Sequence, residues 1–117
     1  MGNIDRLKNS VLEIAVEHYR FKNTFIKAIS KLDFEEQSKY ISQFAWFSKK
    51  VTKAVEDAGL RIVSLEGQAY DPGMAVTPLN IDDFEVEDEL KIVQMIEPII
   101  MQEDTVLKTG TVLLGRI

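Results

Sequence analysis

The sequence contains no cysteine and a single histidine, His18. The absence of cysteine excludes disulfides, thiolate nucleophiles and cysteine-ligated zinc sites. A histidine-based metal site or catalytic dyad would need carboxylates or a second chain. No apolar run approaches the roughly 20 residues that span a bilayer, and the first residues lack the basic-then-apolar pattern of a secretion signal. We therefore expect a cytoplasmic protein that has no metal or cofactor and does not associate with membranes.

The length and the composition of the chain are typical of one folded domain. The chain has 117 residues, of which 45% are hydrophobic and 28% are charged. Its net charge of -5 disfavours non-specific binding of nucleic acid. The charges are divided unevenly, because residues 1–61 hold 11 basic and 8 acidic side chains whereas residues 62–117 hold 3 basic and 11 acidic ones. This asymmetry predicts two structurally different halves.

Residues 4–32 contain neither glycine nor proline, and their apolar side chains recur three and four residues apart. This spacing predicts a long amphipathic helix with a heptad seam, and we expect Asn3 to cap its start. A second apolar stripe makes the face wider than a two-stranded coiled coil needs. The seam consists of Ile4, Leu7, Val11, Ile14, His18, Phe21, Phe25, Ala28 and Leu32.

A second helix is expected to follow at once. Asp33 and Glu36 have the spacing of a capping box, and Gly59 stands where a helix C-terminus favours glycine. The short connection between the two helices predicts an antiparallel helical hairpin over residues 1–59. The apolar seam of the second helix consists of Tyr40, Phe44, Phe47, Val51, Ala54 and Ala58.

The length of the first helix favours a dimer. At about 43 Å it would protrude from a compact monomer about 35 Å across, and two helices alone cannot enclose a core. We therefore predict a homodimer in which two hairpins form a four-helix bundle. We expect His18 to be a buried neutral side chain of that interface. The predicted interface residues are Leu7, Val11, Ile14, His18, Phe21, Phe25, Phe44, Phe47 and Val51.

After Gly59 the apolar period changes from helical to strand-like. Strands are expected at residues 60–66, 90–96 and 109–114. Turn signals occur at residues 71–73 and 103–105, and Pro98 implies a strand edge or a bend. The acidic stretch at 80–89 lacks the glycine and the ligand spacing of a calcium loop, so we expect a solvated loop. Residues 60–117 should therefore form a small, mainly antiparallel β-domain, which makes the fold α+β.

Trp46 lies off the seam of the second helix, and its helical neighbours are Ser42, Gln43, Lys49, Lys50 and Lys53. Two interpretations remain open for this side chain. It could be an anchor that binds a partner protein. Alternatively it packs under the β-domain while lysine stems cover it.

Three short motifs, together with the order of a helical hairpin followed by a small β-domain, resemble those of a known protein family. Residues 53–60, Lys-Ala-Val-Glu-Asp-Ala-Gly-Leu, end the second helix, and residues 68–72 read Gln-Ala-Tyr-Asp-Pro. Residues 106–112 read Val-Leu-Lys-Thr-Gly-Thr-Val. Together they resemble GrpE, the nucleotide exchange factor of DnaK-type chaperone ATPases, whose closing motif is Val-Leu-Arg-Pro-Ala-x-Val. The chain departs from the family at Gly73, at Ile99-Ile100 and at Lys108, where the family usually has Asn, Gly-Tyr and Arg.

The resemblance implies a cytoplasmic co-chaperone of protein folding and the stress response that is not an enzyme. Such a protein binds a DnaK-like ATPase and promotes nucleotide release by favouring its open cleft. The resemblance places the partner-binding surface mainly on the β-domain, with Met74, Val76 and Lys108 as candidates there. Trp46 on the second helix, singled out by its lysine neighbours, is a further candidate for partner binding. The alternative is a dimeric adaptor or scaffold without exchange activity.

Overall fold

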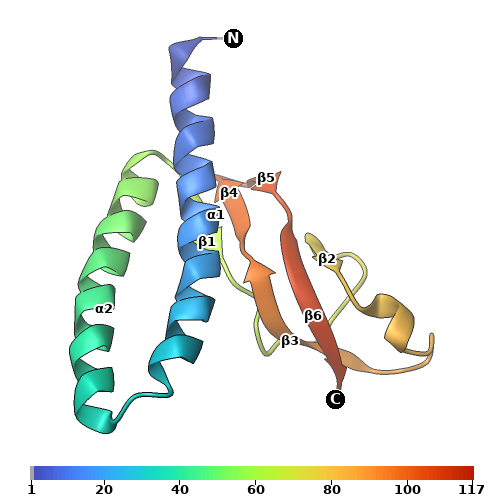
Figure 1. Cartoon of the computed structure of the whole chain (residues 1–117). Coiled ribbons are helices and arrows are strands. Elements are labelled where there is room, and N and C mark those ends of the chain that lie inside the picture. Colours follow the sequence, from blue (N-terminus) through green and yellow to red (C-terminus); the bar gives the residue numbers. More distant parts are fainter. Residues whose placement is uncertain (1) are drawn as a thin grey trace. The chain divides into compact units, whose positions relative to one another are not determined.

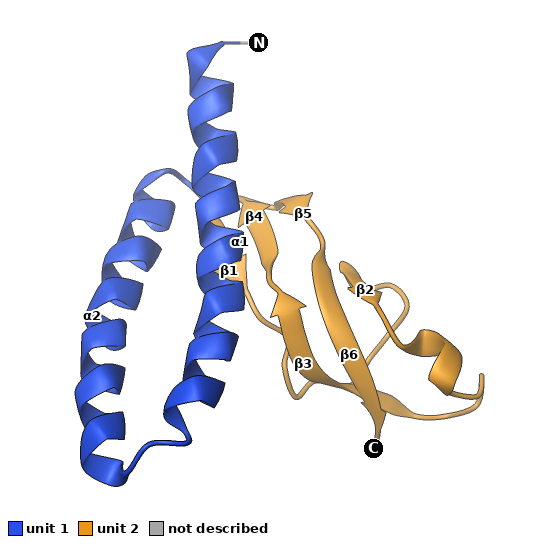
Figure 2. Cartoon of the chain, viewed as in Figure 1, with its two compact units in different colours: residues 1–60 blue, residues 61–117 orange. Residues whose placement is uncertain are grey.

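The computed structural model describes residues 2–117, which form two compact units. The first unit ends at Leu60, and the second runs from Arg61 to Ile117 (Figure 2). The first contains both long helices and the second contains all of the strands (Figure 1). This arrangement confirms the predicted α+β fold class. Within residues 2–117, neither helix has a stretch that is both long and apolar enough to cross a bilayer.

The first unit is a helical hairpin made of α1 (Asn3–Ile29) and α2 (Phe34–Asp57), which run in opposite directions (Figure 1). The N-cap of α1 is Gly2, and no side-chain cap bond is formed there. The prediction that Asn3 caps the helix is therefore wrong, because Asn3 is already its first helical residue. The helix also ends three residues before the predicted Leu32, where the Ser30 hydroxyl donates to the Lys27 carbonyl at 2.7 Å.

Local signals determine both ends of α2. The carboxylate of Asp33 accepts a hydrogen bond from the backbone N–H of Glu36 at 2.9 Å, which confirms the predicted N-cap. At the other end Gly59 has a φ of 84°, a conformation that glycine adopts without strain. The backbone N–H of Gly59 donates to the carbonyl oxygen of Glu56 at 2.9 Å, and the backbone N–H of Leu60 donates to the carbonyl oxygen of Val55 at 3.1 Å. These two bonds form the expected glycine C-terminal motif.

The second unit contains two three-stranded sheets. One is antiparallel, in the order β1-β4-β5, and consists of β1 (Arg61–Val63), β4 (Ile99–Gln102) and β5 (Thr105–Lys108). The other has the order β2-β6-β3 and consists of β2 (Val76–Pro78), β3 (Leu90–Glu97) and β6 (Gly110–Arg116). Since β2 pairs in parallel with β6, the β-domain is mixed, although most of its pairings are antiparallel.

One long bent hairpin links the two sheets. Pro98 separates β3 from β4, and Thr109 separates β5 from β6. Proline has no N–H to donate to a strand partner, so the ladder is interrupted at this point and the chain passes from one sheet to the other. The turn of the hairpin is at Glu103, whose φ is 54°. The bend expected at Pro98 is therefore present, and the turn expected at residues 103–105 is present as well.

The core of the β-domain lies along β3 and β6. Side chains of Ile92, Met95 and Val112 are fully buried, while Lys91 and Val93 on the alternate positions of β3 are exposed. Gly110 begins β6 in this core and is itself buried. A Cβ atom at Gly110 would lie 2.5 Å from the Met95 methyl and 3.1 Å from the Glu97 carbonyl oxygen. Glycine is therefore required by close packing at the start of β6.

We predict that Gly110→Ala lowers the free energy of unfolding by about 1–3 kcal/mol, because the added methyl must displace packed core atoms. Urea denaturation followed by circular dichroism measures the change. Gly73→Ala is the matched control, since its Cβ would make only ordinary contacts, the nearest at 3.7 Å from Asp71. Equal stability of the two variants would contradict this account of Gly110.

Candidate functional site

Five aromatic rings of the helical hairpin form one cluster. Phe25 of α1 stacks on Phe44 of α2 with 4.8 Å between ring centroids. The His18 ring lies parallel to Phe44 at 5.7 Å and is tilted against Phe47 at 5.6 Å. Phe21 completes the cluster, 6.3 Å from Phe44. The structure thus brings together five residues that the heptad pattern predicted to share an interface.

Much of this apolar seam is open to solvent in the single chain. Phe21 is 54% exposed and Phe47 is 52% exposed, and Leu7 and Ile14 further along α1 are exposed as well. Val11 and Val51, the remaining predicted interface residues, are half-buried. A groove of about 320 Å³ lies between the two helices, with Phe25 and Phe44 among its lining residues. An apolar surface of this kind is typical of a protein–protein interface.

His18 is the one member of the five-ring cluster whose side chain is polar. Its Nε2 is hydrogen-bonded to the Ser48 hydroxyl at 2.8 Å. Its Nδ1 is buried and finds no hydrogen-bond partner among residues 2–117. Burial, and secondly the positive charge of Lys22, lower the pKa of His18 below its ordinary value of 6.5. The imidazole is therefore neutral at physiological pH. Ser48 was not anticipated from the sequence because 30 residues separate it from His18.

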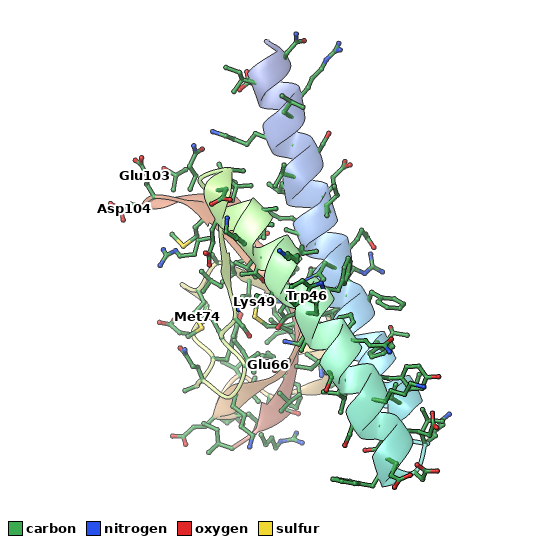
Figure 3. The ribbon with its side chains drawn as sticks, turned by 90° about the vertical axis from the view of Figure 1, so that its left-hand side faces the viewer. Trp46, Lys49, Glu66, Met74, Glu103 and Asp104 are labelled. Carbon is green, nitrogen blue, oxygen red and sulfur yellow. The ribbon has the colours of Figure 1, made fainter. Side chains whose placement is uncertain are left out.

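Trp46 lies outside this seam. Its side chain is 64% exposed, and the Lys50 ammonium lies 4.8 Å from the ring centroid. Figure 3 shows Trp46 and Lys49 on α2. A large aromatic side chain that is exposed beside lysines is available as an anchor for a partner.

The candidates on the β-domain come together through strand pairing. Val76 begins β2 and pairs with Gly110 of β6, and the N–H of Gly110 donates to the Ala75 carbonyl at 3.0 Å. Met74, labelled in Figure 3, lies two residues before Val76, while Lys108 lies two residues before Gly110. Met74, Val76 and Lys108 are all half-buried. The parallel pairing of β2 with β6 therefore brings three predicted partner-binding residues to one part of the β-domain.

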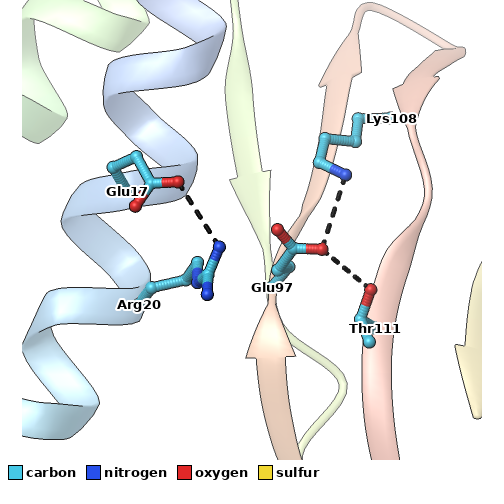
Figure 4. A network of polar contacts seen from close by, with 5 residues as sticks. All are labelled: Glu17, Arg20, Glu97, Lys108 and Thr111. Atoms are coloured by element: carbon cyan, nitrogen blue, oxygen red, sulfur yellow. Dashed lines mark hydrogen bonds and ion pairs between the residues drawn. The ribbon is translucent and has the colours of Figure 1, made fainter. Parts of the chain in front are cut away.

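Lys108 already has a partner within the chain. Its ammonium lies 3.6 Å from Oε1 of Glu97, which also accepts a hydrogen bond from the Thr111 hydroxyl at 2.9 Å (Figure 4). About a third of the Lys108 side chain remains exposed. The sequence gives no local sign of Glu97, because strand pairing brings it near Lys108: Ile100 of β4 pairs with Lys108 of β5, and Glu97 of β3 pairs with Thr111 of β6. The cation is thus oriented by the fold and still reaches the surface.

The described residues contain no other constellation with an obvious chemistry. Within residues 2–117, no group of three or more histidines or carboxylates is arranged to hold a metal ion. Comparison of the chain with family models, curated proteins and solved structures gives no match. The candidate surfaces are therefore described by this chain's own geometry alone.

We predict that the stability of the hairpin falls as the pH drops below about 6.5. The folded state lowers the pKa of His18, so its favourable contribution is complete above the unfolded pKa and is lost as the pH falls through the folded pKa. An NMR titration of the single imidazole should give a pKa below 6.5, and His18→Leu should flatten the acid side of the stability profile. A midpoint at or above 6.5 would contradict the prediction.

Proposed function

We propose that this protein is a dimeric, non-enzymatic co-chaperone of the GrpE type. In this role it binds a DnaK-like ATPase and promotes the release of nucleotide by favouring the open cleft. The observation that carries the proposal is the parallel pairing of β2 with β6. This pairing joins the segment after Asp71-Pro72 to the segment that contains Lys108, and these are two of the motifs on which the resemblance to GrpE rests.

The proposed dimer forms through the exposed aromatic seam of the helical hairpin. Two hairpins packed face to face would make a four-helix bundle and remove Phe21, Phe47 and Ile14 from water. Burying each half-exposed side chain contributes on the order of 1 kcal/mol. Side chains of the second copy would also fill the groove between α1 and α2. The helical unit alone offers no comparable way to cover this surface.

Exchange activity requires only preferential binding. A protein that binds the open, nucleotide-free ATPase more tightly than the closed form lowers the affinity for nucleotide by the same factor. No side chain has to perform chemistry. In this proposal the helical bundle is the rigid body, and the surface of Met74, Val76 and Lys108 contacts one lobe of the ATPase. A carboxylate of the partner would meet Lys108, which the Glu97 carboxylate keeps in position.

A dimeric adaptor without exchange activity is the second candidate. The exposed Trp46, with Lys50 over its ring, favours it. This surface is separate from the aromatic seam and belongs to the helical unit, so it could bind a further protein. An adaptor of this kind would tether its partners without changing nucleotide affinity.

We predict that Phe47→Glu dissociates the dimer at micromolar concentration. The charge would be buried in the bundle, which costs several kcal/mol, whereas the half-exposed position tolerates it in a single chain. Sedimentation velocity gives the mass, and circular dichroism verifies that helix content is kept. Trp46→Glu is the matched control one residue away and should remain dimeric. A wild-type protein that is monomeric at micromolar concentration would refute the proposed assembly.

We predict that the protein accelerates release of a fluorescent ADP analogue from a DnaK-like ATPase, and that Lys108→Gln weakens this effect about tenfold or more. Removing one partner of a desolvated charge pair costs roughly 2–5 kcal/mol, and part of Lys108 is already exposed. Lys91→Gln removes the same charge from an exposed position of β3 and serves as the control. Binding to the ATPase without faster release would support the adaptor function instead.

A further inference from the structure

The β-domain has a groove of about 800 Å³ that the proposed exchange function does not use. One side is formed by residues 69–72, and the other by the loop between β2 and β3, which includes the short 3-10 helix η1 (Ile81–Asp83) (Figure 1). Leu90 at the start of β3 is buried, and Tyr70 and Phe84 beside it are half-buried. The groove therefore has an apolar, partly aromatic lining.

Hydrogen bonds hold both walls of the groove in place. The N–H of Tyr70 donates to the Leu90 carbonyl at 2.8 Å. The side chain of Asn80 makes two bonds with the backbone of Leu114, at 2.9 and 3.0 Å, and so attaches the start of the acidic loop to β6. Near its end, the Asp88 carboxylate accepts from the Glu85 N–H at 2.9 Å. The loop predicted to be merely solvated is thus the preformed wall of a groove.

The rim of the groove is strongly acidic. Asp82, Glu85 and Glu89 line it, and all three are exposed. None of these three carboxylates forms an ion pair with any residue between 2 and 117. They also do not converge as a metal-binding group in that part of the chain. The charge pattern therefore suits a chain of separated cations better than a single metal ion, and it repels phosphates and nucleic acid.

The same loop already binds one guanidinium group. Nε of Arg116 lies 3.2 Å from the Asp88 carboxylate, and its guanidinium carbon lies 5.2 Å from the centroid of the Phe84 ring. Arginine is recognised here by a carboxylate together with an aromatic ring, a combination that favours cations. The free carboxylates of Glu85 and Glu89, with the ring of Tyr70, offer an incoming basic side chain the same kinds of contact.

We propose that this groove binds an extended segment of a partner protein in which lysine or arginine alternates with large apolar residues. The apolar side chains would contact Tyr70, Phe84 and Leu90, and the cations would pair with Asp82, Glu85 and Glu89. Apolar contacts supply affinity, while the charges select against acidic segments and increase the rate of association. The site is independent of the surface of Met74, Val76 and Lys108, so it does not depend on nucleotide exchange.

The test uses the full-length chain and a fluorescein-labelled ten-residue peptide of alternating leucine and arginine. Fluorescence anisotropy should detect binding that weakens as sodium chloride rises from 50 to 500 mM. Two matched peptides, with glutamate in place of arginine or serine in place of leucine, should bind at least tenfold more weakly. Equal binding of the serine peptide would indicate attraction by charge alone and would overturn the proposal.

A pair of charge-matched variants then locates the site. Glu85→Gln combined with Glu89→Gln should weaken binding of the leucine–arginine peptide between about threefold and tenfold, as expected for two surface charge pairs. Glu103→Gln combined with Asp104→Asn removes the same charge at the β4–β5 turn, where Figure 3 labels both residues, and should leave binding unchanged. Equal losses in both variants, or no loss in the first, would overturn the proposal.

Discussion

The pairing of β3 with β6 is the interaction on which the β-domain depends. Its register extends from Leu90 opposite Arg116 to Glu97 opposite Thr111. At one end this pair positions Glu97 against Lys108 and supports β2. At the other end it supports the groove and places Arg116 against the acidic loop. The two proposed binding surfaces thus lie at opposite ends of one strand pair, so a single buried ladder orients both.

The helical unit follows a different principle, because its apolar seam is only partly covered within one chain. The Phe25–Phe44 stack fixes how the two helices meet, while Phe21 and Phe47 remain about half exposed. In the β-domain, by contrast, Ile92, Met95 and Val112 are fully buried. The β-domain has a fully buried core, whereas much of the aromatic seam of the helices stays exposed in the single chain, which is the physical basis of the proposed dimer.

The ends of the helices could be predicted from residues close to them in the sequence, whereas the contacts within the candidate sites could not. The capping residue Asp33 and the terminal glycine Gly59 act on neighbours a few residues away, and both were identified correctly. Asn3 was misjudged because an extended Gly2 can precede a helix without any side-chain cap. The strands β2, β4 and β5 have only three or four residues, and pairing rather than pattern defines them. The contacts of His18 with Ser48 and of Lys108 with Glu97 arise from the fold and have no local signature.

The edges of the mixed sheet limit how copies of the chain can assemble. The edge strand β2 is three residues long and ends at Pro78, which cannot donate a backbone hydrogen bond. The outer edge of β3 is occupied by residues 67–70, since Ile92 exchanges hydrogen bonds with Gly67 and Gln68. Strand-to-strand growth between molecules is thereby discouraged at both edges. In the proposed dimer, two copies would meet through their helices in a two-fold contact. Such a contact uses the same surface of both copies and therefore closes at two copies instead of continuing as a polymer.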